Sequence, residues 1–303
     1  MNNSIPGVGN RGRFATWARV RNLLGCGGLL LCVGWAAAQD KAAAPTPALE
    51  AFDRAEFNER STTIDHPFMP MKPGMRYVYE GTTVKDNGKV VPHRIEVNIT
   101  DLTKVIEGVR VLVSYDLDYS GGKLEEAELA FFAQDKAGNV WHFGQYPEEY
   151  ENGRMSKAPA WIPPFEGARP GIMMRAEPKP GTPSYAQGYG PAVNWADRGQ
   201  ILLMSQTTKV RAGTYTDVLV IRETAAGEDN AFQLKYYARN IGNVRVGWSG
   251  ADKTKETLEL VRIEKLSPTA LAQLRTKALN LEKSAYVHSK NVYARTAPAE
   301  SLK

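Results

Sequence analysis

The sequence predicts a mainly β protein, with a curved antiparallel sheet or incomplete barrel built from a duplicated β-unit and one C-terminal α-helix. Residues 129–140 and 234–244 share an aromatic pair, a short polar turn and a Gly-Asn-Val restart, which indicates two strands joined by a tight connection. Two further blocks match at a similar spacing of about 105 residues. Short alternating segments separated by turn residues fill most of the chain between residues 76 and 265.

The matching blocks indicate a tandem duplication. Residues 104–108 and the apolar strand after them resemble residues 209–213 and their strand, and Lys-Pro-Gly at 72–74 matches Lys-Pro-Gly at 179–181. The blocks occur in the same order in both copies, which favours duplication over coincidence. We therefore expect a β-domain at residues 63–266, with unit one at about 72–144, a connection at 145–178 and unit two at about 179–250.

The first 38 residues predict a signal peptide. A basic n-region, an apolar h-region at 23–35 and the small residues Ala36-Ala37-Ala38 are the three parts of such a segment. The apolar run of about 13 residues is shorter than the ~20 that a membrane-spanning helix needs. We expect cleavage near Ala38, a periplasmic or secreted protein with no transmembrane segment after cleavage, and a linker at 39–62.

Charge and cysteine usage exclude several classes of function. The formal charge is +5, but four arginines in the first 38 residues have no acid to offset them, so the remaining chain carries +1. A nearly neutral protein is not expected to bind nucleic acid. Cys26 and Cys32 both lie in the predicted signal peptide, so the mature chain would hold no disulfide, catalytic thiol or zinc-thiolate site.

Unit one reads as strands joined by turns. Asp86-Asn87-Gly88 and Gly121-Gly122 predict tight hairpins, since both contain residues suited to positive φ angles. The expected strands are 76–80, 90–99, 109–119, 124–133 and 139–143. The connection at 145–178 contains five prolines before Pro178 and predicts a lid or plug over the sheet, because long irregular loops are often functional.

Unit two repeats the strand pattern and leads into a helix. The expected strands are 184–188, 201–210, 216–224, 231–238, 243–248 and 257–265. Residues 201–204 are continuously apolar, which predicts a strand covered on both faces. Ser267-Pro268 predicts a helix start, and an apolar stripe at helical spacing extends over residues 267–288. We expect this stripe either to dock on the sheet or to contact a partner. Residues 289–303 are predicted to be a disordered tail.

No catalytic motif is found in the sequence. A nucleophile elbow, a zinc-binding helix, a phosphate loop and a dinucleotide fingerprint are all missing, and no cofactor is expected. The carboxylates of Glu126, Glu128 and Glu151 follow turns or lie in loops, which predicts solvated charges. A carboxylate-based hydrolase would require distant acids to converge near His93 or His142.

Aromatic and sulfur-containing residues are the candidates for ligand contact. A concave face of a curved sheet can hold an apolar ligand. The candidate ligand-binding residues are Trp141, Phe143, Trp161, Phe165, Met173, Met174 and Tyr236. His66, Met69 and Met71 are the weak candidate for a copper site. In an extended chain His66 points away from both methionines, so no metal site is expected.

Several segments resemble a family of uncharacterised secreted bacterial proteins. The opening of that family has the form D-N-P-aromatic-x-P-L-x-P-G-x-x-aromatic-x-Y-E-G, and His66 and Met71 depart from it. The likeness covers about residues 60–265, without the C-terminal helix, and implies no activity. The segments that carry it are residues 63–81, 135–144, 149–153 and 169–174.

The repeated strand units also resemble, in architecture, the half-barrels of periplasmic lipoprotein-localisation factors, which bind acyl chains in a concave cavity. Together with the duplicated aromatic strands and the absence of catalytic motifs, this resemblance gives the leading hypothesis: a non-enzymatic exported β-protein that binds an apolar or lipid-like ligand on a concave sheet face. The alternative is an envelope structural or interaction module that uses the C-terminal helix or a sheet edge to bind a protein partner. A carboxylate-based hydrolase is the third hypothesis.

Overall fold

The computed structural model describes residues 48–302 except 226 and 229. The β-domain is one antiparallel sheet of 15 strands that is not closed into a barrel, which confirms the predicted fold class. The predicted signal peptide and the first residues of the linker lie outside the described residues. Within the described part of the chain, no helix has the length and apolar character needed to cross a membrane.

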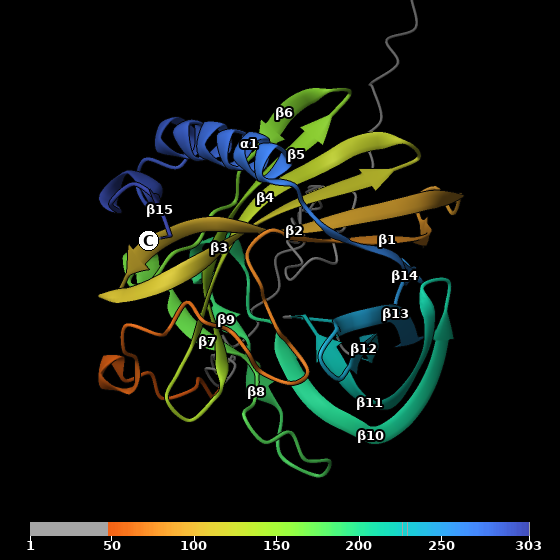
Figure 1. Cartoon of the computed structure of the whole chain (residues 1–303). Helices are drawn as coiled ribbons and strands as arrows, with labels where there is room; N and C mark the ends of the chain where they lie inside the picture. Colours follow the sequence, from red (N-terminus) through yellow and green to blue (C-terminus); the bar gives the residue numbers. More distant parts are fainter. Residues whose placement is uncertain (1–47, 226, 229, 303) are drawn as a thin grey trace, which may run out of the picture.

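Five consecutive strands joined by hairpins form the first half of the sheet (Figure 1). They are β1 (Met75–Val84), β2 (Val90–Ile106), β3 (Val109–Ser120), β4 (Lys123–Gln134) and β5 (Val140–Glu151). The turns at Asn87-Gly88 and Gly121-Gly122 confirm the predicted hairpins. Gly88, Gly121 and Gly122 have φ angles of 78°, 59° and 79°, which glycine adopts without a steric penalty.

Five further consecutive strands form the second half, and β14 pairs with β1 to join the halves into one sheet. They are β10 (Arg198–Val210), β11 (Gly213–Thr224), β12 (Ala231–Ala238), β13 (Gly242–Gly250) and β14 (Thr257–Lys265). The matched sequence blocks fall on corresponding hairpins, β2–β3 with β10–β11 and β4–β5 with β12–β13. This correspondence is what a duplication would produce, and the duplication stays a prediction.

The connection between the halves is not a structureless loop. It contains the end of β5, then β6 (Arg154–Lys157), a 3-10 turn η2 (Phe165–Gly167) and β7 (Arg169–Met174), which pairs with β5. Next come β8 (Tyr185–Ala186), β9 (Gly188–Tyr189) and a 3-10 turn η3 (Pro191–Val193). β8 and β9 belong to opposite ends of the sheet and only Gln187 separates them, so the sheet curls around an interior.

Gly81 allows β1 and β14 to approach closely where the two halves meet. A Cβ at this position would lie 1.8 Å from the carbonyl oxygen of Thr257, which belongs to the backbone of the paired strand and cannot rotate away as a side chain can. We expect Gly81→Ala to lower the free energy of unfolding by at least about 2 kcal/mol, measured by urea denaturation. Gly247→Ala is the matched control, because its Cβ would meet nothing closer than 4.0 Å. Equal effects of the two substitutions would contradict the prediction.

The strand at residues 201–204 is not covered on both faces, so that prediction was wrong. Leu202 and Leu203 are 36% and 45% exposed. β8 pairs with β10 only at Arg198 and Gly199, and the pairing of β10 with β11 is irregular on both sides of Leu203. The local bend turns the two leucines outward at the margin of the sheet.

The C-terminal helix α1 (Pro268–His288) packs on the sheet over β2 and β4 (Figure 1). The Ser267 side chain accepts a hydrogen bond from the Ala270 N–H, which confirms the predicted N-cap. Its apolar stripe is buried in the same chain through Leu274, Ala278, Leu281 and Ala285.

Residues 289–302 do not form the disordered tail that the sequence predicts. They contain a 3-10 turn η4 (Tyr293–Arg295) and β15 (Glu300–Ser301), which pairs with β2. Tyr293 is fully buried against Phe131 and Tyr146, with ring centroids 6.3 and 5.5 Å away. Burial of this aromatic side chain fixes the segment after the helix. A further 3-10 turn, η1 (Arg54–Glu56), precedes β1.

Candidate functional site

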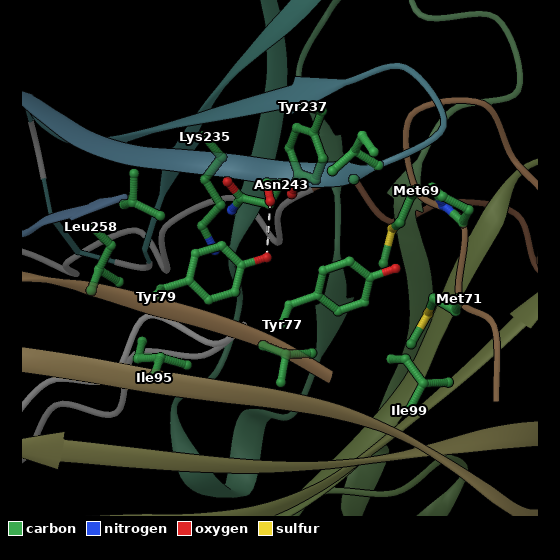
Figure 2. A pocket seen from close by; sticks show the side chains of 15 residues that line it. Met69, Met71, Tyr77, Tyr79, Ile95, Ile99, Lys235, Tyr237, Asn243 and Leu258 are labelled. Atoms are coloured by element: carbon green, nitrogen blue, oxygen red, sulfur yellow. Dashed lines mark hydrogen bonds between the residues drawn. The ribbon is translucent and has the colours of Figure 1, made fainter. Parts of the chain in front are cut away.

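The two halves of the sheet face each other across an apolar pocket (Figure 2). Its lining residues are Met69, Pro70, Met71, Tyr77, Tyr79, Ile95, Val97, Ile99, Lys235, Tyr237, Ile241, Gly242, Asn243, Val246 and Leu258. The cavity volume between these side chains is about 60 Å³. The pocket in this conformation is therefore narrow and suits a slender apolar group.

Strand pairing determines which side chains face the pocket. Antiparallel partners project from the same face, so Tyr77 lies beside Val97, and Tyr79 lies beside Ile95. The Tyr79 hydroxyl donates to the carbonyl oxygen of Asn243 at 2.9 Å, as Figure 2 shows. This hydrogen bond connects β1 to β13 and holds the two walls of the pocket together.

Met69 and Met71 line the pocket from the segment that precedes β1. The Met71 N–H donates to the carbonyl oxygen of Ile64 at 3.0 Å, so the backbone of this segment is anchored. Both thioether side chains are buried. Because methionine is unbranched and has three rotatable bonds, these two residues form the part of the lining best able to adapt to a ligand.

Two pairs of buried carboxyl groups lie on β3 and β4. Asp116 is directly opposite Glu128, and Asp118 is directly opposite Glu126. Asp116, Asp118 and Glu128 are each 1% exposed and Glu126 is 6% exposed. The predicted solvation of Glu126 and Glu128 was therefore wrong. Like charges directly opposite each other destabilise a strand pair, so this arrangement is costly unless the carboxyls are protonated or paired with a cation.

The carboxyl pairs lie in register with the pocket wall. Val97 pairs with Asp116, and Ile95 pairs with Asp118, between β2 and β3. Neighbouring strands are about 4.8 Å apart. The carboxyls of β3 therefore lie one strand beyond the apolar lining of β2, on the same face of the sheet.

Burial keeps these carboxyls partly protonated at neutral pH. Burial raises the pKa of Asp116 to about 7 and that of Glu128 to about 8. Burial, and after it the charge of Glu128, raises the pKa of Glu126 well above its ordinary value. The carboxyls of Glu126 and Glu128 are hydrogen-bonded to each other, which requires a proton on one of them.

His93 on β2 lies between two carboxylates. Its Nε2 is 2.8 Å from Oδ1 of Asp118, and its Nδ1 is 2.9 Å from Oε1 of Glu256. Burial disfavours the imidazolium, but Asp118 and Glu256 outweigh burial and raise the pKa of His93 to about 10. His93 is therefore charged at neutral pH, and both of its nitrogens are engaged, so it is not poised to act as a general base.

Lys235 supplies a positive charge from the opposite wall. Its Nζ is 2.9 Å from Oε2 of Glu223, and Nε2 of Gln187 donates to Oε1 of the same carboxylate at 2.8 Å. Lys235 lines the pocket and is 2% exposed. Its charge also acts on Glu128, where it opposes the burial that raises the pKa of that carboxyl.

None of the seven predicted ligand-binding residues lines this pocket. Trp141 and Phe143 pack edge-on against phenylalanines of the segment before β1, and Trp161 packs on Trp195 with ring centroids 4.6 Å apart. Phe165 lies under the guanidinium of Arg295, Tyr236 lies under that of Arg245, and Met173 and Met174 are buried in the main core. Ligand contact by these residues stays a prediction.

The weak copper candidate does not assemble around His66. Nδ1 of His66 accepts from the Phe68 N–H at 3.1 Å, and Nε2 contacts the carbonyl oxygen of Arg175 at 3.0 Å. Both nitrogens are therefore engaged by backbone, while Met69 and Met71 face the pocket. Across residues 48–302 without 226 and 229, no group of three or more His, Cys, Asp or Glu side chains is placed to hold a metal ion.

His142, the other histidine considered as a base, lies among aromatic rings. It stacks on Phe132 at 5.1 Å and meets Trp161 and Trp195 edge-on at 5.0 and 5.3 Å. Burial lowers the pKa of His142 to about 3, so the ring is neutral at pH 7. This environment indicates a packing role.

Comparison with known proteins leaves the family open. No family profile matches the chain, and no curated protein matches it either. Two solved structures are similar: a putative exported protein with a YmcC-like fold from Bacteroides fragilis, and a putative lipoprotein from Parabacteroides distasonis. The identities are 12% and 9%, both TM-scores are 0.36, and each alignment covers 66% of this chain and 100% or 99% of the other. Membership of the secreted family that the sequence resembles stays a prediction.

Proposed function

We propose that this protein is exported and that it binds one slender apolar ligand, such as a hydrocarbon chain, between the halves of its sheet. The pocket itself is the observation that carries the proposal. Its lining is almost entirely aliphatic, aromatic or thioether, and transfer of apolar surface from water into such a site is favourable. The narrow free space favours a flexible chain over a rigid ring system.

Export rests on the sequence of residues 1–38, with its arginines, its apolar run and its alanines before the expected cleavage point. A chain that leaves the cytoplasm without cysteines must be stabilised by its core. The continuous core along both halves of the sheet supplies that stability.

Ligand binding is favoured over the two alternatives. Acids do converge beside His93, as a carboxylate-based hydrolase requires, but Asp116, Asp118, Glu126 and Glu128 are at most 6% exposed and none of them lines the pocket, so a substrate held in the pocket would not have its scissile bond between them. An interaction module built on α1 would have to undock the helix, because its apolar stripe is buried on the sheet. The exposed pair Leu202 and Leu203 is too small a patch to define a partner.

The proposal is tested by titrating the purified full-length protein with 1-octanol and by native mass spectrometry for a co-purifying mass. Val97→Phe places a ring in the pocket and is expected to weaken octanol binding at least about tenfold. Val105→Phe, the same substitution at an exposed site on the same strand, is the control and should bind like the wild type. No octanol binding by the wild type, or equal binding by both variants, would refute the proposal.

A further inference from the structure

Beyond the β2 wall of the pocket, the same face of the sheet carries buried carboxyl groups. Two cross-strand rows start at the pocket lining, and each continues across β3 to a carboxyl on β4. The rows are Tyr77–Val97–Asp116–Glu128 and Tyr79–Ile95–Asp118–Glu126. Because antiparallel partners share a face, the carboxyls and the apolar lining project into the same interior.

Two oxygens in the carboxyl cluster lack a hydrogen-bond partner. Oδ1 of Asp116 accepts from the Ser114 hydroxyl at 2.6 Å and from the Asn98 N–H at 3.2 Å. Among the described residues, no donor reaches Oδ2 of Asp116 or Oε1 of Glu128, although each residue is 1% exposed. Buried polar atoms are nearly always hydrogen-bonded, so two such oxygens on facing strands indicate a site for a donor from outside the chain.

Acidic groups outnumber basic groups around the cluster. His93 serves both Asp118 and Glu256, and Lys235 is paired with Glu223. The remaining acids facing the cluster are Asp116, Glu126 and Glu128, together with Glu149 of β5, which pairs with Lys157 at 2.7 Å. Lys235 also acts on Glu128, but the acids around the cluster still outnumber the cations.

We propose that Asp116 and Glu128 form a cation subsite beside the pocket, beyond its β2 wall, and that the ligand is an apolar amine. The ammonium group would donate to Oδ2 of Asp116 and Oε1 of Glu128, while the hydrocarbon part lies among the apolar lining residues. This inference rests on the proposed apolar-ligand binding and adds the chemistry of the head group. A carboxylate head group would face repulsion at the same place.

An ammonium fits this site better than a metal ion does. In the described part of the chain, no three acidic, histidine or cysteine side chains are arranged so that they could hold a metal ion. A divalent cation needs about six oxygen ligands at short distance. A primary ammonium needs only two or three acceptors, and it brings a hydrocarbon chain that suits the adjoining pocket.

Amine binding should release protons. Glu128 is mostly protonated at pH 7, whereas an ammonium requires an ionised carboxylate as its acceptor. The proton displaced from the cluster then passes to the buffer. A neutral alcohol of the same chain length does not require an ionised carboxylate, so its binding should leave the protonation of the protein unchanged.

The test compares octylamine, 1-octanol and octanoate by calorimetric titration of the full-length protein at pH 7, in two buffers of different ionisation enthalpy. We expect octylamine to bind at least about tenfold more tightly than octanol and to release about one proton, with octanoate weakest. Glu128→Gln should reduce octylamine affinity at least about tenfold, and by much more than it reduces octanol affinity. Glu151→Gln, which removes an exposed carboxylate at the end of β5, is the control and should match the wild type.

The outcomes separate the two proposals. If octanol binds but octylamine binds no more tightly and releases no proton, the cation subsite is refuted and the apolar pocket stands. If none of the three compounds binds, both proposals fail. If octylamine affinity is insensitive to Glu128→Gln and Asp116→Asn, the ammonium lies elsewhere and the assignment of the subsite is wrong.

Discussion

Replacing Glu282 by alanine is expected to destabilise the protein by about 3–5 kcal/mol, because it leaves a buried ammonium without its counter-ion. Lys104 on β2 is fully buried, and its Nζ lies 2.9 Å from Oε1 of Glu282 on α1. Burial lowers the pKa of Lys104, and Glu282 opposes that effect. Without Glu282, the lysine must either lose its proton or pull water into the interface between helix and sheet.

Glu282 also fixes the chain that follows the helix. Its carboxylate accepts from the Tyr293 hydroxyl at 3.2 Å and from the Ala299 N–H at 3.0 Å. The Lys104 ammonium lies 4.4 Å from the centre of the Tyr293 ring. Loss of one carboxylate therefore affects β2, α1 and the C-terminal segment together, which is why we expect an effect larger than that of an ordinary surface substitution.

Urea denaturation of the single variant and of an apolar double variant measures the effect. The apolar pair Lys104→Met and Glu282→Leu should recover most of the stability lost in Glu282→Ala, since no buried charge remains. Lys283→Ala changes the next residue of the helix, which is exposed, and should stay within about 0.5 kcal/mol of the wild type. A loss below about 1 kcal/mol in Glu282→Ala would show that the pair does not hold the helix on the sheet.

Locally encoded features could be predicted from the sequence. The hairpins at Asn87-Gly88 and Gly121-Gly122, and the helix start at Ser267-Pro268, each depend on the conformational preferences of a few neighbouring residues. The fold class followed from the repeated alternation of short strands. These features are correct because no distant contact is needed to establish them.

The pocket could not be located in the same way. Its walls are contributed by residues 69–99 and 235–258, which meet because β1 pairs with β14. No short sequence pattern predicts that pairing, because β1 and β14 are far apart in the sequence. The sequence directed attention to the connection at 145–178, where prolines and aromatic residues gather, and the structure shows that its strands complete the sheet instead of lining this pocket.

The buried carboxyls were missed although a signal was present. Asp116 and Asp118 precede the Gly121-Gly122 turn, and Glu126 and Glu128 follow it at nearly the same distances. Folding the hairpin at that turn places acid opposite acid. Residues two apart along a strand project from the same face, so this spacing puts all four acids on one face of the hairpin. The sequence did not decide whether that face is the interior or the solvent side, and acids are more often found at the solvent side.

Those acids predict that stability falls as the pH rises above about 6.5. Burial raises the pKa of Glu128 from 4.5 to about 8, so the folded protein keeps a proton that the unfolded chain loses. Glu128 does not destabilise the folded protein below pH 4.5, where the carboxyl is protonated in both states. The destabilisation grows as the pH rises from 4.5 to the folded pKa. For His93, the folded pKa of about 10 exceeds the ordinary 6.5, so its contribution is complete below 6.5 and is lost as the pH approaches 10. Both groups therefore lower the stability of the folded protein as the pH rises.

Below pH 6.5 two buried histidines with lowered pKa values have the opposite effect, because they make the folded protein less stable as the pH falls. Burial lowers the pKa of His142 to about 3 and also lowers that of His66, so the stability they confer is present above 6.5 and is lost as the pH falls. They offset part of the gain from Asp116, Asp118 and the glutamates in that range. Glu128 and His93 act together from about pH 6.5 to pH 9, where, of these buried groups, only Lys104 opposes them, because burial lowers its pKa.

Urea denaturation at pH 6.5 and pH 9 should therefore show a loss on the order of 3 kcal/mol at the higher pH. Glu128→Gln removes one of the groups responsible, so this variant should be more stable than the wild type at pH 9 and should have a shallower pH profile. Glu151→Gln should keep the slope of the wild type, because its carboxylate is exposed in the folded protein. A profile that is flat or rises over this window would show that the acids of β3 and β4 are ionised and solvated in the folded protein. That result would also remove the proton release expected on amine binding, so the stability profile is a ligand-independent check on the same cluster.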